Sequence, residues 1–529
     1  MRILNALIRR VLPSRRADFT KAVLRTALIS ILIATALSAC GKSSTQRALP
    51  AKTNSNTVVT YAASASVTSF DPASLTSAGA DQAAYLGIVY DYLVQFGESA
   101  TPQPDLATSW VYNSPTQITF QLRRGVTYQD GSAFTAQTAA ASLNRSIKAA
   151  GIRSASLSPI DTVAATAAYT LQITLKTPDP DLLYTLASGP AAMASPKAFT
   201  NGSLKSIPDG TGEYIYQPSK SVPGDHYGFV ANPKWWNSSP SLPQNLLISV
   251  IPDPTARLHA VQTGQVDLAV VDASDAAQAK GDGLQVTAGP TQWFGLVILD
   301  RAGKTVPAFA NPLVRQAMAL AINRQTFVKA VLYGYGQATD QPIATGQPGF
   351  DSALESQYAY NIEKAKSLIA RSGFKRITFD AAFSSSGSLA GAEVLQADLA
   401  AIGITMTITA VPETELAPLA RTTKYPVVAG ANFPTYDVYG RYLALFSPKA
   451  GFNPFHVVEP GLDSLAAQLA LTTNTSKADV IAQEMTDYEV RNGLVVVAAI
   501  VDTVVASSHK VTGVVVQNGA PLLDALRVP

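Results

Sequence analysis

The sequence predicts an α/β protein with two lobes. Short strand-like runs alternate with helical stretches along the chain, and this pattern is typical of strands and helices packed in layers. The chain has 529 residues, which is too long for a single hydrophobic core and therefore favours two or more lobes. Residues 1–39 are set apart from these lobes, because they have the charge and hydropathy pattern of an export signal.

The N-terminal segment begins with basic residues and continues into an apolar run. Seven basic side chains precede the uncharged stretch from Thr26 to Ala39. This stretch is shorter than the roughly 20 residues that span a bilayer, so a cleaved signal peptide is predicted at residues 1–39. Residues 14–21 (SRRADFTK) resemble a twin-arginine signal with one extra residue before Phe19. Both general secretion and twin-arginine export therefore stay open.

Cys40 is the only cysteine of the chain and directly follows Leu37-Ser38-Ala39. Leu-Ser-Ala-Cys resembles the lipobox of bacterial lipoproteins, in which the cysteine carries a lipid and becomes the new N-terminus. We therefore expect lipidation at Cys40 and an anchor at the outer face of the cytoplasmic membrane, in the periplasm or at the cell surface. A plain signal peptide with an incidental cysteine, or an uncleaved anchor, is the alternative. The small polar residues 40–56 predict a flexible tether.

Charge and motif content argue against several classes of function. Since the whole chain carries +3 and residues 1–39 carry +6, the remainder carries −3, which does not favour a nucleic-acid partner. The four histidines have no second histidine or cysteine at metal-ligand spacing, so neither a metal site nor a cofactor is predicted. No Gly-x-Ser-x-Gly elbow occurs, and no catalytic residues are predicted.

The individual elements follow from local periodicity and from turn residues. Alternating runs predict half-buried strands, whereas a continuous apolar run predicts a strand that is covered on both faces. Helices are expected where glycine- and proline-free stretches end at glycine, or where Asn-Pro opens them. The expected strands are 58–62, 118–122, 171–175, 246–251, 404–408 and 494–505, and the expected helices are 135–149, 254–263, 311 onward, 362–370 and 392–401.

Several short motifs occur along the chain in a recognisable order. Residues 104–110 read PDLATSW, and residues 118–131 read ITFQLRRGVTYQDG. Further on, residues 210–214 read GTGEY and residues 264–267 read GQVD. By their number and order, these motifs resemble the extracellular solute-binding proteins of peptide and nickel ABC importers, family 5. Glu213 departs from the family pattern, which has proline at this position.

This resemblance implies a periplasmic-binding-protein-like fold of type II, cluster C, with an extra subdomain in the first lobe. On that basis we expect the first lobe to be discontinuous, with a hinge of two chain crossings that lets the lobes close on a solute. The expected ranges are 57–83, 207–292 and 495–529 for the first lobe, 84–206 for the inserted subdomain and 293–494 for the second lobe.

The resemblance also implies a function. A monomeric protein of this family would capture a peptide or a similar small solute between its lobes and deliver it to the permease subunits of an ABC transporter. Two alternatives stay open: a lipoprotein that senses a signal peptide or another small molecule, and an exported hydrolase. A hydrolase would need a nucleophile and a base lining the cleft.

Candidate ligand-binding residues follow from the aromatic and polar character of cleft walls. Asp437 could pair with the amine of a peptide and Arg441 could hold its carboxylate, although a solvated loop with a local ion pair would show the same pattern. A tryptophan is usual in this segment of the family, and its absence leaves the ligand class open. The candidates are Phe70 after the first strand, Trp293 and Phe294 where the chain enters the second lobe, and Phe433, Tyr436, Asp437, Tyr439 and Arg441. Core packing explains Trp293 and Phe294 equally well.

Overall fold

The computed structural model describes residues 57–75, 79–97, 99–149, 152–237, 239, 241–355, 357–429 and 437–529. The predicted signal peptide, Cys40 and the predicted tether lie outside the described residues, as do Phe433 and Tyr436. Across the described ranges, none of the helices is both long enough and apolar enough to cross a bilayer.

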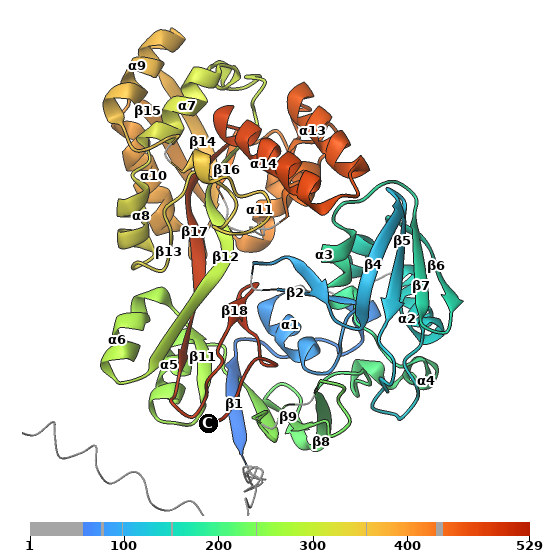
Figure 1. Cartoon of the computed structure of the whole chain (residues 1–529). Coiled ribbons are helices and arrows are strands. Elements are labelled where there is room, and N and C mark those ends of the chain that lie inside the picture. The colour runs from blue at the N-terminus through green and yellow to red at the C-terminus, as the bar shows by residue number, and fades with distance from the viewer. Residues whose placement is uncertain are drawn as a thin grey trace, which may run out of the picture. The chain divides into compact units, whose positions relative to one another are not determined.

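A mixed sheet of eleven strands is the largest unit of secondary structure among the described residues (Figure 1). The short strand β13 (Gly336–Gln337) pairs with β17 beside the main path. Along that path the strand order is β15 (Ile404–Val411), β14 (Ile377–Ser384), β16 (Val427–Ala429), β12 (Gln285–Ile298), β17 (Val495–Ser507), β11 (Leu268–Val271), β1 (Val58–Ala63), β10 (Asn245–Val250), β9 (His226–Ala231) and β8 (Tyr214–Val222).

Two long antiparallel strands, β12 and β17, join the two halves of this sheet. Their pairing runs from Gln285 opposite Ser507 to Val297 opposite Val495, with a register shift between Pro290 and Gln292. The C-terminal half of β17 pairs with β11, and the C-terminal end of β12 pairs with β16. Each long strand therefore contributes to both halves, and the predicted lobe boundaries fall within β12 and at the start of β17.

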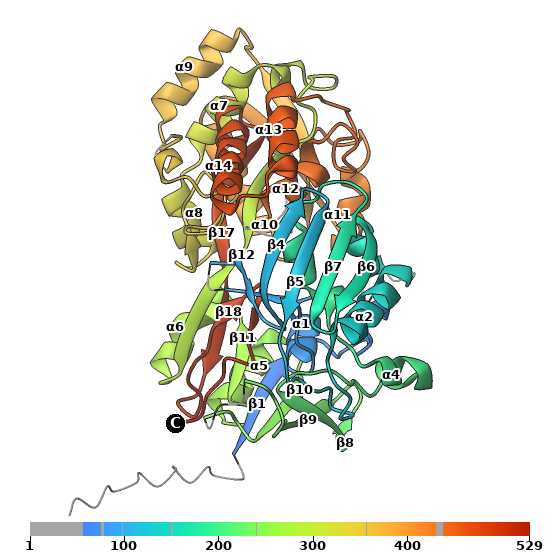
Figure 2. The ribbon, with the colours of Figure 1, turned by 45° about the vertical axis from the view of Figure 1, so that its right-hand side comes forward.

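The inserted range 84–206 contains a separate antiparallel sheet, which Figure 2 shows with helix α2 beside it. Alternate residues of its central strands are buried, as the sequence pattern predicts. The strands of this sheet, in order, are β4 (Ala107–Ser114), β5 (Gln117–Leu122), β7 (Thr170–Leu175) and β6 (Ile160–Ala167). The same range also contains the separate strand pair β2 (Val94–Phe96) and β3 (Pro102–Pro104) and the helices α2 (Ala136–Lys148), α3 (Leu182–Leu186) and α4 (Pro196–Asn201).

Several of the remaining helices have capping residues that the sequence predicts. Asn311 accepts a hydrogen bond from the Leu313 amide and opens α7 with proline at its first position, and Gly373 ends α9 at φ 80°. The helices are α1 (Ala80–Gly87), α5 (Pro254–Gln262), α6 (Ala276–Gly281), α7 (Pro312–Ala321), α8 (Arg324–Val331), α9 (Ile362–Ser372), α10 (Leu389–Ala400), α11 (Glu413–Ala420), α12 (Val438–Arg441), α13 (Pro460–Leu471) and α14 (Thr475–Arg491).

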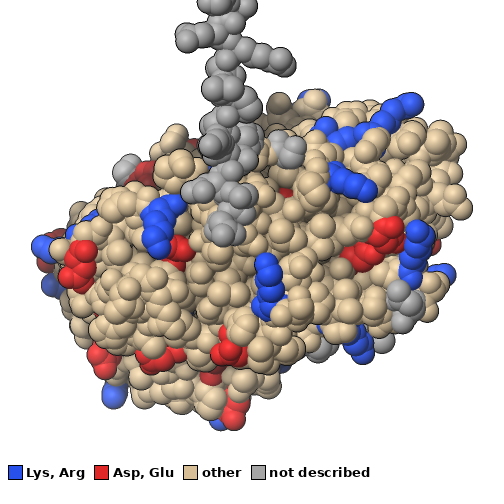
Figure 3. Space-filling view, turned by 90° about the horizontal axis from the view of Figure 1, so that it is seen from below, with Lys and Arg blue, Asp and Glu red and all other residues tan. Residues whose placement is uncertain are grey.

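The structure confirms the expected strands and helices within a few residues. Two differences reach three residues: β15 continues to Val411, and α10 begins at Leu389, because Gly391 is accommodated inside the helix against Phe294. The division into lobes stays a prediction, and we keep its names: the first lobe, the inserted subdomain and the second lobe. On the face seen in Figure 3, acidic and basic side chains are interspersed among uncharged residues, without a large area of one sign.

Candidate functional site

Phe70 lies in an aromatic cluster of the first lobe. Its side chain is 2% exposed, and its ring centroid lies 5.1 Å from that of Tyr216 and 6.2 Å from that of Tyr227. The following Asp71 forms two hydrogen bonds, of 2.6 and 2.7 Å, with the Arg145 guanidinium of the inserted subdomain. Packing thus accounts for the position of Phe70, and its contact with a ligand stays a prediction.

Trp293 and Phe294 face opposite sides of the main sheet, because neighbouring residues of a strand alternate. Trp293 is fully buried with Val297 and residues of α13 and α14. Phe294 is also buried, and its ring lies 5.2 Å from that of Phe327. Trp293 therefore lies in one core of the second lobe and Phe294 in the other, so the structure does not bring the two side chains together.

The described part of the candidate segment 433–442 forms the short helix α12. Asp437 is its N-cap and accepts a 2.6 Å hydrogen bond from the Gly440 amide. Asp437 also lies beside Asp181 of the inserted subdomain, close enough for their carboxyl groups to share a hydrogen bond. Burial raises the pKa of Asp181 well above its ordinary value, and the Asp437 carboxyl raises it further. Two parts of the chain thus meet at a carboxyl pair.

Tyr439 and Arg441 follow Asp437 on the same helix but have different surroundings. Tyr439 is half-buried, and burial followed by the charges of Asp179 and Asp181 raises its pKa. Arg441 is 2% exposed and its Nε lies 2.9 Å from a Glu489 carboxylate oxygen. Its Nη1 and Nη2 atoms have no hydrogen-bond partner among the described residues. These two donors are available only to a group that enters the protein interior.

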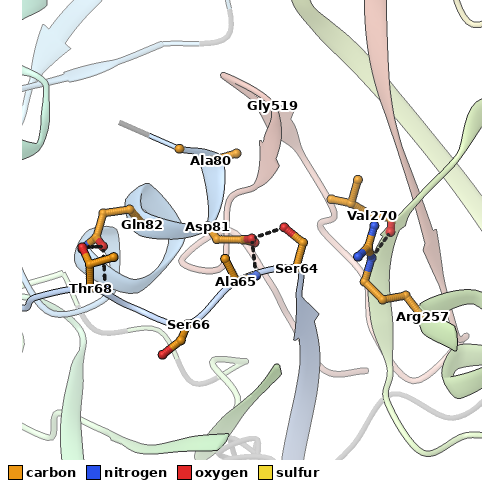
Figure 4. A pocket seen from close by; sticks show the side chains of 11 residues that line it. Ser64, Ala65, Ser66, Thr68, Ala80, Asp81, Gln82, Arg257, Val270 and Gly519 are labelled. Carbon is orange, nitrogen blue, oxygen red and sulfur yellow. Dashed lines mark hydrogen bonds between the residues drawn. The ribbon is translucent and has the colours of Figure 1, made fainter. Parts of the chain in front are cut away.

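A pocket of about 250 Å³ lies where β1 ends, close to helix α1 (Figure 4). Asp81 points toward the end of the strand and accepts hydrogen bonds from the Ser64 hydroxyl at 2.5 Å and from the Ala65 amide at 2.9 Å. The opposite wall is formed by Arg257, whose Nε donates to the Val270 carbonyl. Ligands commonly bind at the carboxyl ends of parallel strands, which is the edge that this pocket occupies.

A larger cavity, of about 720 Å³, lies on the first lobe and the inserted subdomain. Residues of α1, β12 and the C-terminal range 517–527 line it together with Trp235 and Trp236. Four carboxyl groups are among its described lining residues, and sequence reasoning did not identify them as a site: Asp91, Asp105, Glu213 and Asp524. The available signal was Glu213, which departs from the family motif.

Within the described ranges, no three or more His, Cys, Asp or Glu side chains are arranged to hold a metal ion. The four carboxyl groups of the large cavity are thus too dispersed for one metal coordination sphere.

Comparison with known proteins gives the family. A sequence profile of bacterial extracellular solute-binding proteins, family 5, matches residues 101–454. The chain belongs to this family. The chain is 29% identical to the nickel-binding periplasmic protein of Escherichia coli over 347 residues, covering 60% of this chain and 64% of that protein. It is 27% identical to heme-binding protein A of Haemophilus influenzae over 425 residues, covering 73% and 76%.

Solved structures of family 5 binding proteins show the same fold. The binding protein DppA of Helicobacter pylori, in complex with the peptide STSA, superimposes with a TM-score of 0.68 at 20% identity, covering 89% of this chain and 98% of that chain. The predicted fold is therefore confirmed: the chain is an α/β protein of the two-lobed periplasmic-binding type. At this identity the likeness establishes the fold alone.

Proposed function

We propose that this family 5 protein is the substrate-binding component of an ABC importer and not an enzyme. The observation that carries the proposal is the family match over residues 101–454 on a sheet whose halves are joined by β12 and β17. Two strand crossings allow hinge motion between the lobes, and closure on a solute requires no bond to be made or broken. The permease subunits of the transporter are the proposed partners, and the protein acts as a monomer.

The proposed solute is a peptide or a similar small molecule with an amine. The carboxyl groups of Asp181 and Asp437 support this class, because an ammonium group placed between them can pair with both. Arg441, on the same helix, has two guanidinium nitrogens without a partner among the described residues, which suits a carboxylate that enters the interior. The relatives named above bind nickel, heme and a peptide, so the solute is proposed from these side chains and not from the family.

The test of the amine anchor is Asp437→Ala. Native mass spectrometry of the purified protein identifies the co-purifying solute, which is then titrated into both proteins by calorimetry. We expect the substitution to weaken binding by at least about tenfold, as for the loss of a charged hydrogen bond. Asp380→Ala is the matched control, because Asp380 is an exposed acid of the second lobe. Unchanged affinity in Asp437→Ala would remove the anchor role, and cleavage of the added peptide would favour the hydrolase alternative.

The proposed location is the outer face of the cytoplasmic membrane, through a lipid on Cys40. The N-terminal sequence supports it, since Leu37-Ser38-Ala39-Cys40 follows a basic lead and an apolar run. The intact mass of the membrane-extracted protein tests this proposal. We expect a chain that begins at Cys40 and carries acyl groups, and an unlipidated chain in Cys40→Ser.

A further inference from the structure

The large cavity is a candidate for a second kind of binding. Its volume of about 720 Å³ lies within the range of small-molecule pockets, roughly 300–1,000 Å³. Its walls come from separate parts of the chain, since α1 and Trp236 face the C-terminal range 517–527. A cavity of this size holds far more than one ordered water molecule.

The charge that lines the cavity is strongly unbalanced. Four carboxyl groups contrast with one guanidinium, that of Arg527, among the described lining residues. The Nη1 of Arg527 donates to the main-chain carbonyls of Asp524 and Leu526 rather than to a carboxylate. Asp91 has its own donors, because the indole nitrogens of Trp235 and Trp236 lie 3.4 and 3.0 Å from its two oxygens. Asp105 has a donor as well, since it accepts a 2.8 Å hydrogen bond from the Tyr92 amide.

Glu213 is the carboxyl group without a partner. It is 1% exposed, and neither of its oxygens has a hydrogen-bond partner in the described part of the chain. Burying an unpartnered carboxyl group costs several kcal/mol when it is charged, and the group is still unsatisfied when it is protonated. Burial raises the pKa of Glu213 well above its ordinary value, and the nearby Asp524 carboxyl raises it further.

The backbone around Glu213 holds it in this position. The Gly212 amide donates to the Val89 carbonyl at 2.9 Å, and the Tyr214 amide donates to the Ile88 carbonyl at 2.8 Å. A Cβ at position 212 would lie 2.6 Å from the Val89 carbonyl oxygen, so the loop packs directly against the neighbouring backbone. The main chain on both sides of Glu213 is therefore fixed against the neighbouring backbone at the wall of the cavity.

We propose that the cavity binds a monovalent organic cation, an ammonium or guanidinium group, with Glu213 as its anchor. Binding of the cation releases the Glu213 proton to solvent, and the carboxylate that forms supplies the charge, while Tyr92 and Phe96 supply aromatic surface. Next to the cavity, the lining residue Trp236 already contacts a guanidinium, since the Arg123 Cζ lies 3.9 Å from its ring centroid. A metal ion is disfavoured, because no group of the described acids and histidines has the arrangement to hold one. This site does not depend on the proposed importer role.

Calorimetric titration with butylguanidinium tests the proposal, with butylurea as the uncharged ligand of the same shape. We expect butylguanidinium to bind and butylurea not to bind. Glu213→Gln keeps the side-chain shape and should weaken butylguanidinium binding by at least about tenfold, as for one charged hydrogen bond. Glu363→Gln is the control, because that carboxylate is 86% exposed on α9, and it should bind like the wild type.

A second pair of ligands separates the two sources of such a cation. If Glu213→Gln also weakens Ala-Arg-Ala but not Ala-citrulline-Ala, the site takes a basic side chain of a peptide. If it weakens butylguanidinium alone, the site takes a free cation. The proposal is overturned if the wild type does not bind butylguanidinium, or if wild type and Glu213→Gln bind it equally. Loss of the importer role, by contrast, would leave all of these titrations unchanged.

Discussion

Two buried charged residues, Arg441 of the second lobe and Glu213 of the first lobe, have opposite surroundings. In the second lobe, Arg441 contacts Glu489 at 2.9 Å and Arg301 contacts Glu459 at 3.2 Å, so these buried charges have partners within the lobe. In the first lobe, Glu213 lies at a cavity wall without any partner among the described residues. The contact between the Arg441 Nε and Glu489 holds the structure of the second lobe, whereas neither oxygen of Glu213 has such a contact, an arrangement that a ligand would complete.

Breaking a buried pair should have the largest effect on stability. Arg441→Met removes the guanidinium and leaves Glu489 buried without its cation, which should lower the free energy of unfolding by about 3–5 kcal/mol. Urea unfolding followed by circular dichroism measures the change. Arg371→Met, at an exposed position of α9, is the control and should change little. A loss below about 1 kcal/mol would mean that the pair contributes no more than a surface contact.

The pair that joins the first lobe to the inserted subdomain should rank second. Arg145→Met leaves the largely buried Asp71 without its two hydrogen bonds and should cost about 1–3 kcal/mol. Burial alone would raise the pKa of Asp71, but the hydrogen bonds and charge of Arg145 outweigh it and lower the pKa below its ordinary 3.8. The contribution of the pair is therefore present above about pH 4 and lost as pH falls through the lowered pKa. An Arg145→Met deficit that persists unchanged at pH 2 would show that charge is not its source.

Replacing the unpaired acid Glu213 should stabilise the protein, whereas breaking either of the two pairs should destabilise it. Glu213→Gln should raise the free energy of unfolding by about 1 kcal/mol at pH 7, because it removes a group whose ionised form is excluded from the folded protein. The native pKa is raised, so the wild type loses stability as pH increases above the ordinary value of 4.5, and the variant does not. The two proteins should unfold alike below that pH. Destabilisation by Glu213→Gln at neutral pH would mean that the carboxylate has a partner in the folded chain.

An exposed ion pair of the second lobe should have the smallest effect on stability of the four. Glu363 and Lys366 lie 3.4 Å apart on α9 with most of both side chains in water. Glu363→Gln should change the free energy of unfolding by no more than about 0.5 kcal/mol. The same urea titrations measure it, and a larger change would show that exposed charges in this lobe are coupled to its core.

The sequence predicted the elements better than it predicted the site. Alternation and caps identified β5, β7, α7 and α9, because those signals are local. The surroundings of Trp293 and Arg441 depend on α13 and α14, which lie far along the chain, so no local pattern could show that both side chains are buried. The sequence left two explanations open for Trp293, ligand contact and core packing. Its place in a core of the second lobe favours packing.

Glu213 is the opposite case, since its departure from the family motif was visible in the sequence. The sequence did not show that Glu213 lines a cavity. That cavity is formed together with the C-terminal range 517–527, which lies some 300 residues later in the chain. Cys40, Phe433 and Tyr436 lie outside the described residues, and their roles stay predictions.

The place of β17 in the sheet also determines the order in which the protein can fold. This strand lies between β12 and β11 in the middle of the main sheet, yet it follows both of them in the sequence, with residues 299–494 between β12 and β17. A growing chain can form the inserted subdomain early, because the strands and helix of that unit are close in sequence. The main sheet stays divided until residues 495–507 are available to close it. Folding of the two-lobed body is therefore completed only when residues 495–507 pair with strands that lie far from them in the sequence, after local elements such as the inserted subdomain can form.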